Sequence, residues 1–471
     1  AFLVAIGFMI YGTEVWVIRA VQVMLYVITI IITVLIGKRI WRLEVGLMAG
    51  LILAIPTVNT TLYTTVSLGG YGEALVLGNL SLLLTLFILD GISNEDVMAP
   101  KKVWTAIFAL GVLIGFGWWV NGITLVYSLP ALLMIFHQSS MKKKTVRIPM
   151  QVLTLVVLGF IIGAIPVWLY GYQNGFVNVF GELFGSAVSV EGGSLISRAL
   201  DHTRNLLVLG FPVILGLRAP WEVRWLGIPL IPIVIIMWSL VFWFVVDQII
   251  HRKHRSGITL LVGVCLALIF GFIFSSFGID PSGRYFLPLV TPMALFCAAW
   301  MDTAIKTNHV KIAIILALVG YHVWGTLNCA YRNPPGITTQ FNSIAQIDHQ
   351  ADGELIQFLS DQHEYYGYTN YWVAYPLAFH SDEKLIYIPR LPYHEDFRYT
   401  ARDDRYSPYA EKVRQSDRVA YIVTHHAALN DHLRTAFSAL QVSWKEETIG
   451  DYQIFYDLSE PVKPETMGLG Q

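Results

Sequence analysis

The feature that most constrains this chain is a series of long apolar segments separated by short polar loops. About 20 apolar residues in a helix are needed to cross a bilayer, and several segments reach that length. Charged residues form only 14% of the 471 residues, whereas a soluble domain carries about 25%. Ten segments are candidate spans: 16–36, 43–58, 72–90, 103–119, 121–136, 148–170, 226–250, 257–277, 284–301 and 311–331. The sequence therefore predicts an α-helical polytopic membrane protein with about ten visible spans.

Two stretches depart from this pattern. Residues 1–10 are apolar but too short to span, so we expect a helix at the membrane surface. This start has neither a Met nor the basic residues of a signal peptide, so we also expect an N-terminal span to be missing. The segments on either side of residues 118–122 (WWVNG) are short, and a re-entrant hairpin is an alternative to two spans there.

Basic residues gather in alternate loops. These loops carry Lys38, Arg39 and Arg42; Lys101 and Lys102; Lys142, Lys143, Lys144 and Arg147; Arg252, Lys253 and Arg255; and Lys306 and Lys311. The intervening short loops carry almost none, and loops rich in Lys and Arg stay in the cytoplasm. We therefore expect a multi-pass protein of the cytoplasmic membrane whose segment 171–225 and C-terminal part lie outside the cytoplasm. The net charge of −1 identifies no partner beyond the lipid bilayer, and we expect no nucleic acid.

From Arg332 onward the composition becomes that of a soluble domain. Helices are expected at 352–363, 371–379, 409–415 and 429–439, and strands at 365–368, 384–388, 419–423, 442–447 and 452–457. Helices that alternate with strands favour a small α/β sheet, with 389–408 as a surface loop. The chain is therefore divided into a transmembrane domain (1–331) and an extracytoplasmic α/β domain (332–471).

Residues 67–89 (SLGGYGEALVLGNLSLLLTLFIL) join a glycine-rich turn to an apolar run. Three glycines surround Tyr71, and glycine lets the backbone approach a ligand closely. Glu73 stands at the mouth of the apolar run, where a carboxylate is costly and therefore a candidate for function. The alternative is that Glu73 caps the helix at the water interface. We take Glu73 as the candidate catalytic carboxylate and Tyr71 as a neighbouring site residue.

Other polar residues also fall at the outer ends of the spans. The span ends carry Glu14, Arg19, Asn121, Asp280, Arg284 and Tyr285, and the outer loop adds Glu182, Glu191, Arg198, Asp201, His202 and Arg204. Arginine suits phosphate because its planar guanidinium bonds two oxygens at once, so these residues indicate a site for an anionic lipid head group. The alternative is that they anchor helix ends at the head groups. Residues 280–285 (DPSGRY) predict a tight turn that aims Arg284 at a helix N-terminus, which favours a site role there.

No metal ligand set is expected. His425, His426 and His432 occur close together, but no Cys and no HExxH motif accompanies them. The three cysteines, Cys265, Cys297 and Cys329, lie in apolar runs, so no disulfide framework is expected. A divalent cation ligated by Glu73 is an open alternative, because carboxylates are ligands for such ions.

Five stretches carry a resemblance to a known family: 6–19 (IGFMIYGTEVWVIR), 69–80 (GGYGEALVLGNL), 117–130 (GWWVNGITLVYSLP), 283–288 (GRYFLP) and 370–381 (NYWVAYPLAFHS). The first is similar to the multispan C-type glycosyltransferases, and the other four look like one bacterial subgroup of these enzymes. More narrowly, the first resembles the bacterial branch that includes protein O-mannosyltransferases and the aminoarabinose transferase of lipid A. The resemblance covers nearly the whole chain.

The resemblance implies a site on the extracytoplasmic face and a sugar donor linked to polyprenyl phosphate. Relatives use an acidic residue in the first outer loop as base, and this chain is expected to lack that loop. Glu73 falls where relatives carry a second outer acidic residue. Arg284 and Tyr285 fall where the lipid phosphate binds, with help from Arg198 or Arg204. Asn121, Asp280 and His202 are further site candidates.

The sequence thus predicts an integral membrane glycosyltransferase that acts on a glycan, lipid or protein acceptor outside the cytoplasm. One alternative is a transporter or flippase of lipid-linked glycans, against which stand the lack of repeated halves and of a mid-span carboxylate. A second alternative is a non-catalytic membrane anchor that displays residues 332–471 as a binding module. An acidic residue in the first outer loop would favour the enzyme.

Overall fold

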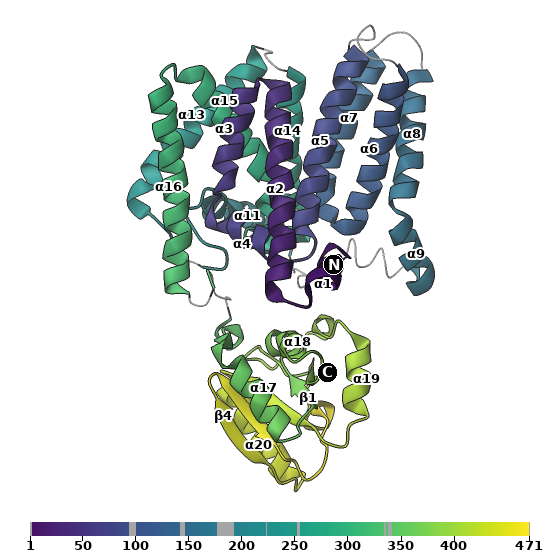
Figure 1. Ribbon diagram of the computed structural model, residues 1–471, viewed down its shortest axis with the longest axis vertical. Helices are drawn as coiled ribbons and strands as arrows, with labels where there is room; N and C mark the ends of the chain where they lie inside the picture. Colours follow the sequence, from purple (N-terminus) through teal and green to yellow (C-terminus); the bar gives the residue numbers. More distant parts are fainter. Residues whose placement is uncertain are drawn as a thin grey trace. The chain divides into compact units, whose positions relative to one another are not determined.

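The computed structural model describes residues 2–93, 100–141, 147–176, 193–222, 224–251, 255–333, 336–337 and 342–470. Glu182, Glu191 and several of the loop lysines and arginines (Lys142–Lys144, Arg252 and Lys253) lie outside these ranges. The chain divides into two compact units, Ala1–Arg332 and Asn333–Gln471 (Figure 1). We call them the membrane unit and the C-terminal unit, and each is described by itself.

The membrane unit is built from helices. They are α1 (Phe2–Tyr11), α2 (Val15–Ile40), α3 (Leu43–Ala54), α4 (Val58–Thr65), α5 (Tyr71–Ser93), α6 (Pro100–Val120), α7 (Leu125–Met141), α8 (Arg147–Gly163), α9 (Ile165–Asn174), α11 (Leu195–Asn205), α12 (Phe211–Ile214), α13 (Ile231–Ile250), α14 (Arg255–Phe274), α15 (Val290–Ala304) and α16 (Asn308–Arg332). Among the described residues, 8 helices are long and apolar enough to span a membrane. The number rises to 10 when the bent pairs α3–α4 and α8–α9 each count as one span. The predicted polytopic fold is confirmed.

Local sequence explains the two exceptions. Residues 2–11 form the short helix α1, as expected. Helices α6 and α7 are joined through Asn121 and a 3-10 turn, and each provides a candidate span of 20 residues, which favours two spans over a hairpin. The bend of 78° between α3 and α4 falls at Pro56, because proline disfavours the helical conformation of the residue before it.

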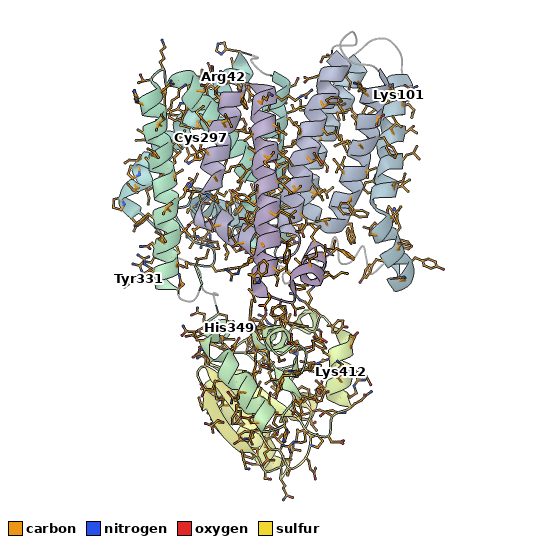
Figure 2. The ribbon with its side chains drawn as sticks, in the orientation of Figure 1. Arg42, Lys101, Cys297, Tyr331, His349 and Lys412 are labelled. Atoms are coloured by element: carbon orange, nitrogen blue, oxygen red, sulfur yellow. The ribbon has the colours of Figure 1, made fainter. Side chains whose placement is uncertain are left out.

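The two ends of the membrane unit differ in backbone as well as in charge. Arg42 and Lys101 lie at one end and Tyr331 at the opposite one (Figure 2). We call the first the basic end and the second the turn end. At the turn end α3 breaks into α4, and α14 leads into α15 through two 3-10 turns, η4 (Ser276–Ile279) and η5 (Arg284–Leu289). Irregular backbone at the membrane exposes polar groups that need partners, so the turn end is the place to look for a site.

Helices α6 and α8 show how small residues set the packing of spans. A Cβ placed on Gly163 would lie 2.1 Å from the carbonyl oxygen of Val112, and one on Gly115 would lie 2.3 Å from that of Phe160. Any larger side chain would force the two helices apart. Close van der Waals packing of this kind holds helices together in lipid, where the hydrophobic effect between helices is weak.

The C-terminal unit is an α/β/α layer structure. Its strands are β1 (Tyr366–Thr369), β2 (Ile386–Pro389), β3 (Ala420–Thr424), β4 (Lys445–Ile449) and β5 (Tyr452–Tyr456), in the order β2-β1-β3-β5-β4. Strands β2, β1 and β3 are parallel, and β5 pairs antiparallel with β3 and β4. The helices are α17 (Asp352–Asp361), α18 (Tyr371–His380), α19 (Ser407–Arg414) and α20 (Ala427–Ala439). The elements follow the alternation that the sequence predicts.

Alternating strand residues bury both faces of this sheet. Ile386 and Tyr421 pack with α19 and α20, whereas their neighbours Tyr387 and Ile422 pack with α17 and α18. This is the period of two that a strand covered on both faces requires.

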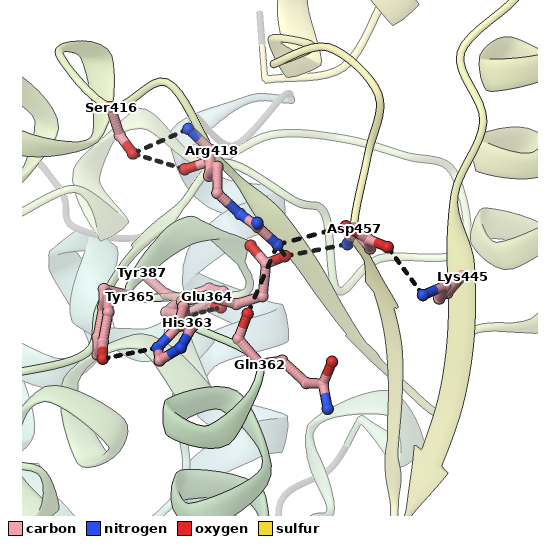
Figure 3. Close-up of polar contacts among 9 residues, drawn as sticks. All are labelled: Gln362, His363, Glu364, Tyr365, Tyr387, Ser416, Arg418, Lys445 and Asp457. Carbon is pink, nitrogen blue, oxygen red and sulfur yellow. Dashed lines mark hydrogen bonds and ion pairs between the residues drawn. The ribbon is translucent and has the colours of Figure 1, made fainter.

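An ion-pair network closes one end of the sheet (Figure 3). The buried Glu364 carboxylate pairs with Arg418 at 2.7 Å and accepts the Asp457 backbone N–H at 3.0 Å, and the Tyr387 hydroxyl donates to the Glu364 carbonyl. Glu364 precedes β1, Arg418 precedes β3, and Asp457 follows the antiparallel β5. The network therefore joins the ends of three adjacent strands, and we interpret its role as structural.

Candidate active site

The turn between α14 and α15 is the most constrained part of the turn end. The Asp280 carboxylate accepts the Ser282 backbone N–H at 2.9 Å and closes the turn expected from the sequence. Gly283 has a φ of +110°, and a Cβ there would lie 2.0 Å from the Asn59 side-chain oxygen. Only glycine satisfies both the backbone conformation and the space, so the turn holds a fixed shape.

Arg284 is held in place directly after this turn. Its Nη2 lies 2.5 Å from Asp280 Oδ2, and its guanidinium carbon lies 5.0 Å from the centre of the Tyr285 ring. Its Nε is buried and has no hydrogen-bond partner in the described part of the chain. The guanidinium is therefore oriented by Asp280 and Tyr285 while a donor stays available, which suits an anionic ligand.

Aromatic side chains connect this turn to the start of α5. The rings of Tyr71 and Tyr285 lie 6.5 Å apart, and that of Tyr63 lies 6.3 Å from Tyr71. The Tyr63 hydroxyl contacts Ser282 in the turn, with 3.4 Å between the two side-chain oxygens. The structure thus brings four predicted site residues together: Tyr71, Asp280, Arg284 and Tyr285.

Arg218 belongs to the same region, and the sequence reasoning missed it. It is fully buried, and it donates from Nη2 to the Pro281 carbonyl at 3.1 Å and from Nη1 to the Glu222 carbonyl at 2.5 Å. Burial lowers the pKa of its guanidinium, because the charged form loses hydration. The sequence signal was a lone charge at the end of the apolar run 206–217, where a cation needs partners. Arg218 supports the turn that carries Arg284.

Glu73 lies at the same end but on another side of α5. It sits in the first turn of α5, two residues after Tyr71, and is partly exposed. Residues two apart on a helix do not face each other, so Glu73 does not share the side on which Tyr71 meets Tyr285. The catalytic role of Glu73 stays a prediction.

Three further candidates lie on helix α11, and their surroundings differ. His202 is 2% exposed, and its Nδ1 lies 2.8 Å from the Ile273 carbonyl oxygen. Arg198, one turn earlier, lines a hollow with His202, Ser275 and Ser276 beside η4, and its buried Nε has no partner in the part of the chain described. Arg204 is exposed, six residues away and on a different face. Of the two predicted phosphate-binding arginines of this helix, Arg198 alone faces the turn between α14 and α15.

Asn121 has a structural explanation. Its Nδ2 donates to the Gly69 carbonyl at 2.8 Å, and its Oδ1 accepts the Ile123 N–H at 3.0 Å. Both halves of the amide are thus used by backbone groups of the glycine turn before α5 and of the turn before α7. These two bonds hold the amide in place and leave its second N–H donor unassigned, so a role of Asn121 at the site stays a prediction.

The described residues offer no ready metal site. No three His, Cys, Asp or Glu side chains come together among them. A divalent cation held by Glu73 together with the donor phosphate needs only one protein carboxylate, so it stays a prediction.

The comparison with solved structures decides the fold. The crystal structure of ArnT from Cupriavidus metallidurans in the apo state matches with a TM-score of 0.59 over 96% of this chain and 86% of that chain, at 12% identity. The chain has the fold of ArnT. ArnT, an aminoarabinose transferase, also matches in its structure bound to undecaprenyl phosphate, with a TM-score of 0.57 at 10% identity over 98% of this chain and 88% of that one.

A further match is more distant. The Archaeoglobus fulgidus oligosaccharyltransferase has a TM-score of 0.48 at 13% identity, over 96% of this chain and 63% of that chain, which is too low to add to the assignment. No protein-family model and no curated protein matches the sequence. The ArnT-like fold is the fold that the family resemblance implied.

Proposed function

We propose that this chain is an integral membrane glycosyltransferase that moves a sugar from a polyprenyl-phosphate donor to a hydroxyl acceptor. The observation that carries the proposal is Arg284, oriented at the turn end by Asp280 and Tyr285 with a buried donor to spare. The ArnT fold supports it, since one ArnT structure is bound to undecaprenyl phosphate.

Arg284 would bind the phosphate that links sugar and lipid. A guanidinium has five N–H donors in a planar fork, and Asp280 occupies only one edge of it. The Coulomb attraction to phosphate is strengthened because the Arg284 side chain is only 28% exposed to water. As the sugar leaves, negative charge builds on the phosphate oxygen, and Arg284 stabilises that charge.

The transfer itself is a displacement at the anomeric carbon. The acceptor hydroxyl oxygen forms a bond to this carbon while its proton passes to a carboxylate. The bond from the anomeric carbon to the phosphate oxygen breaks, and its electron pair stays on the polyprenyl phosphate. Glu73 is the carboxylate that we propose for this proton, and a single displacement would invert the sugar.

The turn end would face the outside of the cytoplasmic membrane. The support is the gathering of Lys and Arg at the opposite end, which predicts that end to be cytoplasmic. The acceptor, a glycan, lipid or protein, would then be extracytoplasmic.

The test is turnover by the purified full-length protein. It would be incubated with a set of polyprenyl-phosphate sugars and a mixed cell-envelope acceptor fraction, and release of free polyprenyl phosphate would be measured by mass spectrometry. Release from at least one donor, abolished in Arg284→Ala, is expected. Movement of intact donor across vesicles without cleavage would instead identify a flippase and overturn the proposal.

A further inference from the structure

A groove opens on the membrane unit at the basic end, away from the turn end. It has a volume of about 900 Å³ and is bounded by α2, α5 and α6. Its floor is one stripe of α5 with the spacing of a single helix face: Leu80, Leu83, Leu84 and Phe87. The α6 wall repeats the pattern from Thr105 to Leu113. The groove is therefore a continuous apolar channel between three helices.

The depth of the groove matches one leaflet. From Asp90 near the end of α5 to Leu80 is ten residues, or roughly 15 Å at 1.5 Å per residue. This is about half of the ~30 Å hydrocarbon core of a bilayer. A polyprenyl chain is longer than the groove is deep, whereas a phospholipid acyl chain fits it.

Two cations stand at the mouth of this groove. Arg39 is fixed there by Asp90, with 2.8 Å between Nη2 and Oδ2, and by the Phe87 ring 5.3 Å from its guanidinium carbon. Lys38 also lines the mouth, is exposed, and has no ion-pair partner among the described residues. With Asp90 included the mouth carries one net positive charge, which complements a phosphate at the membrane surface.

We propose that this groove binds one anionic glycerophospholipid from the leaflet at the basic end. The lipid phosphate would contact Lys38 and Arg39, and an acyl chain would lie along Leu83, Leu84 and Phe87. Basic pockets between membrane helices recognise anionic head groups through this combination of charge and apolar depth. The proposal does not depend on the proposed transferase activity.

The experiment is native mass spectrometry of the purified full-length protein with equal amounts of phosphatidylglycerol and phosphatidylcholine. Wild type should retain phosphatidylglycerol in preference. The double variant Lys38→Gln/Arg39→Gln should lose this preference by about 25-fold, since each of the two cations near a membrane surface contributes a factor of about five. Leu83→Trp, which fills the floor and leaves both charges in place, should lower retention of both lipids.

The matched control is Lys101→Gln/Lys102→Gln, which removes two exposed cations from the same end but outside the groove. It should retain lipid as wild type does. Equal retention by the Lys38/Arg39 variant, equal loss in the control, or undiminished binding by Leu83→Trp would each overturn the proposal. Unchanged elution on gel filtration would show that the variants are folded.

Discussion

The two ends of the membrane unit use arginine in opposite ways. At the basic end Arg42 is 54% exposed in its side chain and pairs with Asp302, which also binds Lys311 at 3.0 Å. At the turn end Arg218 is fully buried and donates to backbone carbonyls, and Arg284 is mostly buried with a donor left over. The first arrangement satisfies its charges with carboxylates near water. The second holds its arginines in mostly buried positions, where Arg284 pairs with Asp280 and Arg218 bonds to backbone carbonyls.

This contrast separates anchoring from site chemistry. An exposed pair such as Arg42–Asp302 is screened by solvent and contributes little beyond orientation. Burying a guanidinium costs desolvation free energy, so a buried arginine in a membrane protein is a candidate for a functional role. Arginines near the ends of spans look alike in the sequence. Their burial in the structure distinguishes an anchoring residue from a candidate site residue.

The largest effect expected is on the side of the membrane that each end faces. A cysteine at the exposed Ser407 in the C-terminal unit should react with an impermeant thiol reagent in intact cells. Thr307→Cys at the basic end should react only after lysis. Background should be low because the native Cys297 and Cys329 are buried and Cys265 is only partly exposed within its apolar helix. The reverse labelling would place the basic end outside and contradict the assignment.

Removing Arg284 should produce the next largest effect. Arg284→Ala should lose about 2–4 kcal/mol of transition-state stabilisation, the scale for a group that meets developing charge. Arg284→Lys keeps the charge but not the planar fork, and should recover only part of the rate. Turnover and apparent Tm would be measured together, with Arg42→Ala as the basic-end control. Wild-type turnover in Arg284→Ala would reduce this residue to an anchor.

Glu73→Gln should fold normally and lose about 100-fold in turnover, the scale for a lost acid–base group. The matched control is Glu44→Gln, which changes the same residue type in the first turn of α3 at the basic end. Near-normal turnover of the Glu73 variant would assign it the capping role instead, worth about 0.5–1 kcal/mol of stability.

A smaller effect should come from the buried Arg218. Arg218→Leu leaves the Pro281 and Glu222 carbonyls without their donor. An unsatisfied buried polar group costs on the order of 1–3 kcal/mol, so the apparent Tm should fall by several degrees. Arg42→Leu should leave the Tm nearly unchanged. Partial recovery of the Tm by Arg218→Lys would be expected. Equal losses for the Arg218→Leu and Arg42→Leu variants would erase the contrast between the two ends.

The sequence predicted the parts of the fold that follow from periodicity. Each of the ten apolar segments corresponds to a helix or bent helix pair, because a span needs a long apolar run whatever its neighbours are. The strands and helices of the C-terminal unit followed from alternation in the same way. The bend at Pro56 was not predicted, since proline in a span bends or is accommodated according to its surroundings.

The site was only partly predictable, since burial depends on partners far away in the chain. Tyr71 and the 280–285 turn were found from local composition, and the structure brings them together. Arg218 was missed because nothing local shows that Pro281 would supply its acceptor. Arg198 and Arg204 were treated alike, although Arg198 lies on a partly buried side of α11 and Arg204 on an exposed one.

The most direct test of the account is the affinity of the full-length protein for undecaprenyl phosphate, the part shared by donor and product. Titration in detergent by tryptophan fluorescence would compare wild type, Arg284→Ala and the basic-end control Arg42→Ala. We expect the Kd to rise at least about 30-fold for Arg284→Ala, corresponding to the lower bound of about 2 kcal/mol, and to stay unchanged for Arg42→Ala. An unchanged Kd for Arg284→Ala, or an equal rise for Arg42→Ala, would contradict the assignment of the turn end as the site.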